Sequence, residues 1–131
     1  MFTARRALCA GTVVGLAAAT LGGCTDVVDS EIARNDLVSL MVVGVRGVRT
    51  LRLDPAPGAQ INALLPPTVE FSPTERLQLS SPLVTADSSY FTASPSVSID
   101  EIRAKRGVLR ASVCPAALKV CTFVELPVVL P

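Results

Sequence analysis

The ten prolines of this 131-residue chain are spread among short apolar runs, and this spacing limits the fold more than any other feature. Proline lacks a backbone N–H and interrupts a helix interior, so this distribution argues against long helices. Several runs instead alternate apolar and polar residues, as in residues 49–53, where Leu51 and Leu53 share one face and Arg52 takes the other. The pattern predicts an all-β protein, with at most one helical turn in the charged segment 100–106.

Short strands are expected throughout the chain beyond residue 37, separated by turn-forming segments such as residues 54–58. Roughly seven to nine strands, at spacings of about ten residues, predict a two-sheet sandwich of immunoglobulin-like type. Aromatic residues make up only 4% of the chain, so the core of this sandwich must be aliphatic. The expected strands cover residues 37–48, 49–53, 61–65, 69–71, 77–79, 90–92, 97–99, 108–114 and 121–130.

Residues 1–23 have the composition of a secretion signal of the lipoprotein type. Arg5 and Arg6 precede an uncharged apolar stretch, residues 7–21, that is too short for a comfortable membrane span. The stretch leads into Leu-Gly-Gly-Cys, which resembles the bacterial lipobox and predicts a diacylglycerol on the thiol of Cys24. An ordinary signal peptide and an uncleaved anchor are the alternatives. We therefore expect a cell-envelope lipoprotein, anchored to membrane lipid on the extracytoplasmic (periplasmic) side.

The rest of the chain divides into a tether and one domain. Residues 24–37 are acidic and are expected to hold the domain off the membrane, and residues 38–131 have the length of a single domain with a core. Without Arg5 and Arg6, ten basic residues face eleven acidic ones, giving a net charge of −1. With no basic run, no Trp and one Tyr, nucleic-acid binding is not expected. The chain has no His, and we expect neither a metal site nor a cofactor.

The four cysteines have different expected fates. Cys9 leaves with the signal and Cys24 carries lipid, so Cys114 and Cys121 remain as the two thiols of the folded domain. In an oxidising compartment these two are expected to form a disulfide. Strand parity places Cys114 with Arg110 on the less apolar face of its strand. The same argument applied to residues 121–130 predicts a solvent-accessible disulfide at the end of a hairpin.

The spacing of this pair is compatible with two roles. A disulfide that closes so small a ring stabilises a fold by about 2.5 kcal/mol in the chain-entropy model, which suits a passive clip of the last hairpin. An accessible sulfur beside a cation suits thiol–disulfide exchange, and Lys119 lies within the ring. The spacing alone does not choose between these roles.

Two segments together resemble a known family. Residues 57–67 read Pro-Gly-Ala-Gln-Ile-Asn-Ala-Leu-Leu-Pro-Pro, and residues 107–114 form a strand that ends in Cys114 and is followed by Cys121. In this order and separation they are similar to the amino-terminal domain of the thiol:disulfide interchange protein DsbD. The resemblance covers roughly residues 38–131 and implies an immunoglobulin-like domain with Cys114 and Cys121 as the redox-active pair. In the family an aromatic cap shields the disulfide, and Tyr90 and Phe91 are candidates here, with a core role as the alternative for Phe91.

The resemblance also implies partners. In the family the cysteine pair receives electrons from a membrane domain and passes them to thioredoxin-like proteins, so a separate membrane electron donor is expected here. On this interpretation the chain is a component of a protein-disulfide reductase. The alternative is a non-enzymatic structural or binding lipoprotein module with a purely structural disulfide.

Overall fold

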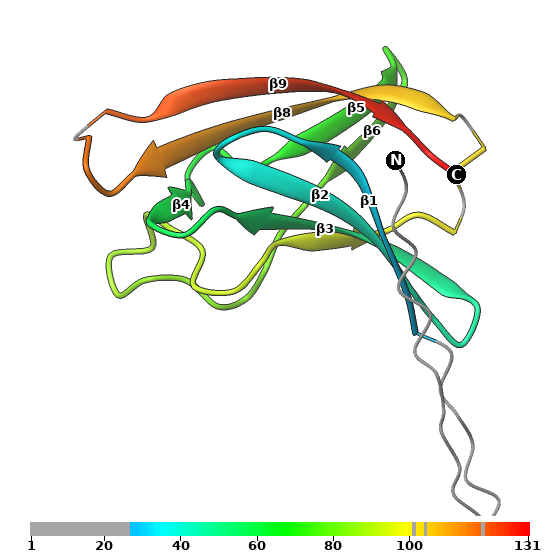
Figure 1. The fold of residues 1–131 in the computed structure, drawn as a ribbon, viewed down its shortest axis with the longest axis horizontal. Helices are drawn as coiled ribbons and strands as arrows, with labels where there is room; N and C mark the ends of the chain where they lie inside the picture. Colours follow the sequence, from blue (N-terminus) through cyan, green and yellow to red (C-terminus); the bar gives the residue numbers. More distant parts are fainter. Residues whose placement is uncertain (1–26, 101, 104, 119) are drawn as a thin grey trace, which may run out of the picture.

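The computed structural model describes residues 27–100, 102–103, 105–118 and 120–131. Within these residues the chain forms two β-sheets and no helix, which confirms the predicted all-β sandwich of immunoglobulin-like type (Figure 1). No helix in this part of the chain is long and apolar enough to cross a membrane. The strands are β1 (Val27–Arg34), β2 (Val38–Val45), β3 (Val48–Pro55), β4 (Ala59–Ile61), β5 (Thr68–Ser72), β6 (Glu75–Gln78), β7 (Ser96–Ser98), β8 (Arg106–Pro115) and β9 (Thr122–Val129).

The two sheets have different strand orders. The first runs β1-β2-β3-β7. The second is centred on β8, which pairs with β9 along one side and with β4 and β5, followed by β6, along the other. The inner faces meet in a core that is aliphatic, as the composition predicts. Its fully buried members include Leu40, Leu51, Leu53, Ile61, Val69, Leu79, Ile99, Leu109, Val113 and Val128.

The expected tether, residues 24–37, is corrected by the structure from Val27 onward. Residues 27–34 form β1, an edge strand paired with β2. Its acidic residues Asp29 and Glu31 are exposed, whereas Ile32 lies partly buried against the core. The acidic character thus marks the solvent side of a strand, and charged side chains on an edge strand also discourage pairing with other chains.

One of the expected strands is in fact a hairpin. Residues 37–48 were expected as one strand, but the chain reverses at Arg46 and Gly47, which both have positive φ (51° and 81°), so that Val45 pairs with Val48. Two consecutive residues with positive φ form the tight turn that matches the twist of paired strands. This turn separates β2 from β3.

The sandwich has two distinct ends. At one end are the β2–β3 turn and the start of β1, because Val27 and Val48 both pair with Val45. At the other end β3 leads into β4, which pairs with the last residues of β8, where Cys114 lies. Figure 1 shows the β2–β3 turn and the β8–β9 tip on opposite sides of the molecule. We call these the hairpin end and the disulfide end.

Candidate redox disulfide

The pairing of β8 with β9 brings the two cysteines together. The ladder runs from Arg106 opposite Val129 to Val113 opposite Thr122, so the next residues in register are Cys114 and Cys121. They form a disulfide across the mouth of the hairpin, with a Cα–Cα distance of 4.0 Å and a sequence separation of 7. The predicted disulfide is therefore present, and it joins two strands of the same sheet.

The disulfide lies on the outer face of the second sheet. Leu109, Ala111 and Val113 of β8 belong to the core, and side chains alternate along a strand, so Cys114 points to the opposite face. Strand parity therefore predicted the correct face. The prediction that both cysteines are accessible is wrong for Cys114, which is only 7% exposed, whereas Cys121 is exposed. Cys114 lies on the central strand of the sheet, with β4 on one side and β9 on the other.

A buried polar residue lies two positions before Cys114. Ser112 shares the outer face with Cys114 and is 5% exposed. Its carbonyl oxygen accepts a hydrogen bond from the backbone N–H of Asn62 at 2.9 Å, and its Oγ lies 3.5 Å from the Asn62 amide nitrogen. Ser112 is thus joined to the residue that follows β4.

Asn62 in turn fixes the loop that follows it. Its Oδ1 accepts hydrogen bonds from the backbone N–H groups of Leu64 at 2.8 Å and Leu65 at 3.3 Å, an arrangement typical of an Asx turn. The turn leaves both leucines exposed. The expected strand at residues 61–65 therefore stops at Ile61, because the Asn62 side chain competes with the sheet for the next backbone donors.

Large apolar side chains are exposed on segments that flank the disulfide. Leu118 and Val120 lie in the loop between the cysteines, and Phe123 is 68% exposed opposite Ser112. Exposed apolar groups gathered around one feature are typical of interaction sites. Sequence reasoning missed them, although the parity of Phe123 with Cys121 was a usable signal for an outward-facing aromatic. We call this set the apolar rim: Leu64, Leu65, Leu118, Val120 and Phe123.

Two hollows of the described surface lie away from the cysteines. One, of about 360 Å³, lies over β5 and β8 and includes Glu70, which forms ion pairs with Arg76 and Arg110. The other, of about 460 Å³, lies beside β1 and the end of β3. Neither is lined by Cys114 or Cys121.

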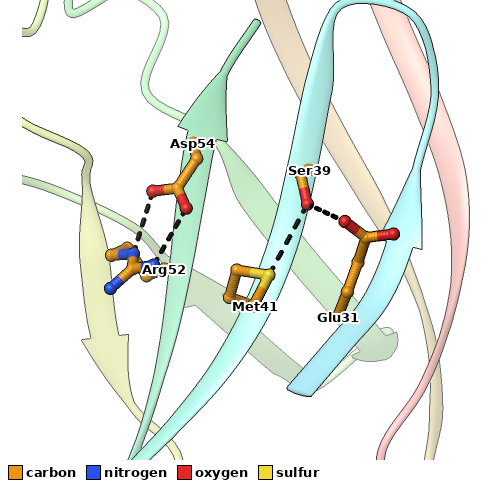
Figure 2. Close-up of polar contacts among 5 residues, drawn as sticks. All are labelled: Glu31, Ser39, Met41, Arg52 and Asp54. Atoms are coloured by element: carbon orange, nitrogen blue, oxygen red, sulfur yellow. Dashed lines mark hydrogen bonds and ion pairs between the residues drawn. The ribbon is translucent and has the colours of Figure 1, made fainter. Parts of the chain in front are cut away.

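Two acidic residues of the second hollow, Glu31 and Asp54, are already engaged. Arg52 binds Asp54 through two hydrogen bonds of 2.9 and 3.0 Å, and the bond to Asp54 raises the pKa of Arg52 (Figure 2). Ser39 donates to Glu31 at 2.6 Å, and the sulfur of Met41 lies 3.6 Å from the same hydroxyl. Within the described residues no group of three His, Cys, Asp or Glu side chains is arranged to hold a metal ion.

Several predicted residues cannot be placed or lie elsewhere. Cys9, Cys24 and Lys119 fall outside the described residues. Phe91 packs against the core, which is the role given above as the alternative to an aromatic cap. Tyr90 forms a backbone bridge with Asn62. Comparison of the chain with protein-family models, curated proteins and solved structures finds no match.

Proposed function

We propose that the protein is an extracytoplasmic thiol–disulfide exchange domain that uses the Cys114–Cys121 disulfide. The observation that carries the proposal is the asymmetry of the pair: one half-cystine is exposed at the end of the sandwich and its partner is buried. The apolar rim around it offers a surface on which a thiol protein can dock. The resemblance to the amino-terminal domain of DsbD points to the same activity and to thioredoxin-like partners.

The burial of the two cysteines predicts the order of bond changes. A thiolate of the partner attacks Sγ of Cys121, the partner–Cys121 disulfide forms, and the Cys114–Cys121 bond breaks. The electron pair of that bond leaves on Sγ of Cys114, which then takes a proton from solvent. A second thiolate of the partner attacks the partner sulfur of the mixed disulfide and releases Cys121 as a thiolate. The partner dithiol is then oxidised and the cysteine pair is reduced, and the reverse steps regenerate the disulfide.

A purely structural disulfide is less well supported. β8 and β9 are paired along the full length of β9, and Leu109, Val113, Val124 and Val128 from these strands are buried in the core. The disulfide extends a ladder that already exists, and it closes a short ring that contributes only about 2.5 kcal/mol. The hairpin therefore has enough interactions of its own to persist while the disulfide is reduced.

The anchor is a second part of the proposal. The lipobox-like sequence at residues 21–24 supports a diacylglycerol on Cys24 and a location at the extracytoplasmic face of a membrane. A separate membrane protein would then supply electrons to Cys114 and Cys121. The matching experiment is mass spectrometry of the membrane-bound chain, in which a lipid adduct at Cys24 is expected and its absence contradicts the anchor.

The exchange activity is tested by trapping the mixed disulfide. In Cys114→Ala the exposed Cys121 is free, and the probe is a thioredoxin-like protein that lacks its second thiol and carries its first as a disulfide with 2-nitro-5-thiobenzoate. The Cys121 thiolate should attack the probe's sulfur, release thionitrobenzoate with the electron pair of the broken bond, and leave a stable mixed disulfide. In the matched variant Cys121→Ser the remaining thiol is buried, so trapping should be at least tenfold slower. Equal trapping rates would show that the assigned attack site is wrong.

The reduction potential of the wild-type domain provides the second readout. A value above about −300 mV is expected for a disulfide that exchanges with partner thiols. A value well below this, together with no trapping in either variant, would establish a structural disulfide and remove the proposed function.

A further inference from the structure

We infer that the hairpin end is a membrane-contact surface for a bilayer with anionic phospholipid headgroups, and that it holds the disulfide end away from that bilayer. This inference rests on the proposed anchor at Cys24 for its geometry. It adds a second contact with the membrane and a fixed orientation, neither of which follows from a lipid chain alone.

The chain enters the fold at the hairpin end. Val27 pairs with Val45, and Val45 pairs with Val48, so the first described residue lies in the same row as the residues that flank the β2–β3 turn. Cys24 precedes Val27 by three residues, which reach at most about 10 Å. A lipid on Cys24 would therefore bring this turn to the membrane surface.

The β2–β3 turn has the composition of an interfacial contact. Val45 is 39% exposed and Val48 is 51% exposed, and Arg46 and Gly47 between them are exposed as well. Apolar side chains beside arginine suit the boundary between acyl chains and headgroups, where the apolar groups insert and the cation remains at the phosphates. The main-chain N–H of Arg49 binds Asp100 at 2.9 Å, which fixes the turn against the β7–β8 connection.

Positive charge gathers at the same end. Figure 1 shows the β7–β8 connection and the β2–β3 turn on the same side of the sandwich. None of the cations on these two segments or on the first residues of β3 and β8 forms an ion pair with a described carboxylate, whereas Arg34, Arg52, Arg76 and Arg110 elsewhere all do. Two described acidic residues lie at or near this end: Asp100 accepts a hydrogen bond from Arg49, and Asp29 lies on β1 two residues after Val27. The cations are Arg46, Arg49, Arg103, Lys105 and Arg106.

The orientation that results suits the proposed exchange reaction. β3 connects the two ends and its eight residues span about 25 Å. With the hairpin end on the bilayer, the disulfide and the apolar rim lie on the opposite side and face the aqueous compartment. A soluble thiol protein can then reach Cys121 without competing with lipid for the apolar rim.

Tryptophan fluorescence tests the contact directly, because the chain contains no Trp. Val48→Trp in the lipidated full-length protein, reconstituted in vesicles with phosphatidylglycerol and brominated lipid, should be strongly quenched and blue-shifted. Phe123→Trp, at a site of the disulfide end that is 68% exposed against 51% for Val48, is the matched control and should be quenched at least threefold less. Equal quenching at both positions, or none at position 48, would overturn the inference.

A second measurement does not depend on the lipid at Cys24. The described domain, residues 27–131, has its own buried core and can be produced without the signal and the lipid. Its co-sedimentation with phosphatidylglycerol vesicles should weaken about fivefold in Arg46→Gln, the effect of one cation near an anionic surface. It should not change in Arg34→Gln, an exposed cation at the other end of β1.

The outcomes separate the surface from the anchor. If vesicle binding of residues 27–131 depends on Arg46, and mass spectrometry of the full-length chain finds no lipid adduct at Cys24, the membrane-contact surface is supported and the anchor is removed. A lipidated protein whose Val48→Trp is not quenched supports the anchor and overturns the surface. Loss of binding to the same extent in both arginine variants would also overturn it, because the contact would then depend only on total charge.

Discussion

Reduction of the Cys114–Cys121 disulfide in the otherwise wild-type domain should lower the free energy of unfolding by about 2.5 kcal/mol and leave the domain folded. The magnitude follows from the short ring that the disulfide closes, with a sequence separation of 7, in the chain-entropy model. Burial of the inward side chains of β8 and β9, such as Leu109 and Val128, is independent of the bond. Loss of this amount matters, because a domain of this size is stable by only about 5–15 kcal/mol.

Urea unfolding of the domain with and without dithiothreitol measures the effect. The free energy of unfolding falls by about 1–3 kcal/mol per molar urea. The urea concentration at the unfolding midpoint should therefore fall by about 1–2.5 M, while the slope of the free energy against urea concentration stays constant. The control is Cys114→Ala combined with Cys121→Ser. Its unfolding midpoint should equal that of the reduced protein and should be the same with and without dithiothreitol. Alanine is chosen at position 114 because this site is buried, and a serine hydroxyl there would need a partner.

One result would refute the reasoning behind both this prediction and the exchange proposal. If the reduced domain unfolds in buffer, or loses more than about 5 kcal/mol, the ladder between β8 and β9 is not self-sufficient. The disulfide would then be a structural requirement, and a protein that must pass through the reduced state in each cycle could not use it.

Two further predictions concern backbone packing and one exposed carboxylate. Gly107→Ala should destabilise the domain by about 1–3 kcal/mol in urea unfolding. The added Cβ would lie 2.8 Å from the Glu70 carbonyl oxygen and 2.9 Å from the Phe71 ring. An unchanged free energy of unfolding would mean that β5 moves to make room for the methyl group. The hydroxyl of Thr85 and the N–H of Ser89 bind Asp87 and lower its pKa, so the folded state gains stability above the pKa of the unfolded chain and loses it as the pH falls through the folded pKa. In an NMR titration Thr85→Ala should raise the pKa of Asp87, and an unchanged pKa would show that the hydroxyl contributes nothing.

The alternation of apolar and polar residues along the chain predicted the structure well. Leu51 and Leu53 are both fully buried, and Val124 and Val128 face the core as parity required. Side chains that face the same side of a sheet are two positions apart along the strand. The alternation of apolar and polar residues was therefore enough to predict which of these side chains are buried. The two-sheet architecture followed from repeating that signal along the chain.

The errors arose where a local backbone interaction outweighed composition. The turn at Arg46 and Gly47 was missed because the apolar run continues on both sides of it. Leu64 and Leu65 were placed in a strand, although the Asn62 side chain binds their N–H groups and exposes them. The exposure of Cys114 was wrong because parity gives the face of a strand but not the neighbours that cover it.

The two cysteines lie at different places in the sheet and differ in exposure. Cys114 is the next-to-last residue of the central strand β8 and is buried, whereas Cys121 directly precedes the edge strand β9 and is exposed. Any protein that approaches this end meets Cys121 first, together with Phe123 and the loop that carries Leu118. The proposed exchange uses this difference, because an exposed Cys121 and a buried Cys114 would allow a partner thiolate to form a mixed disulfide with Cys121 only.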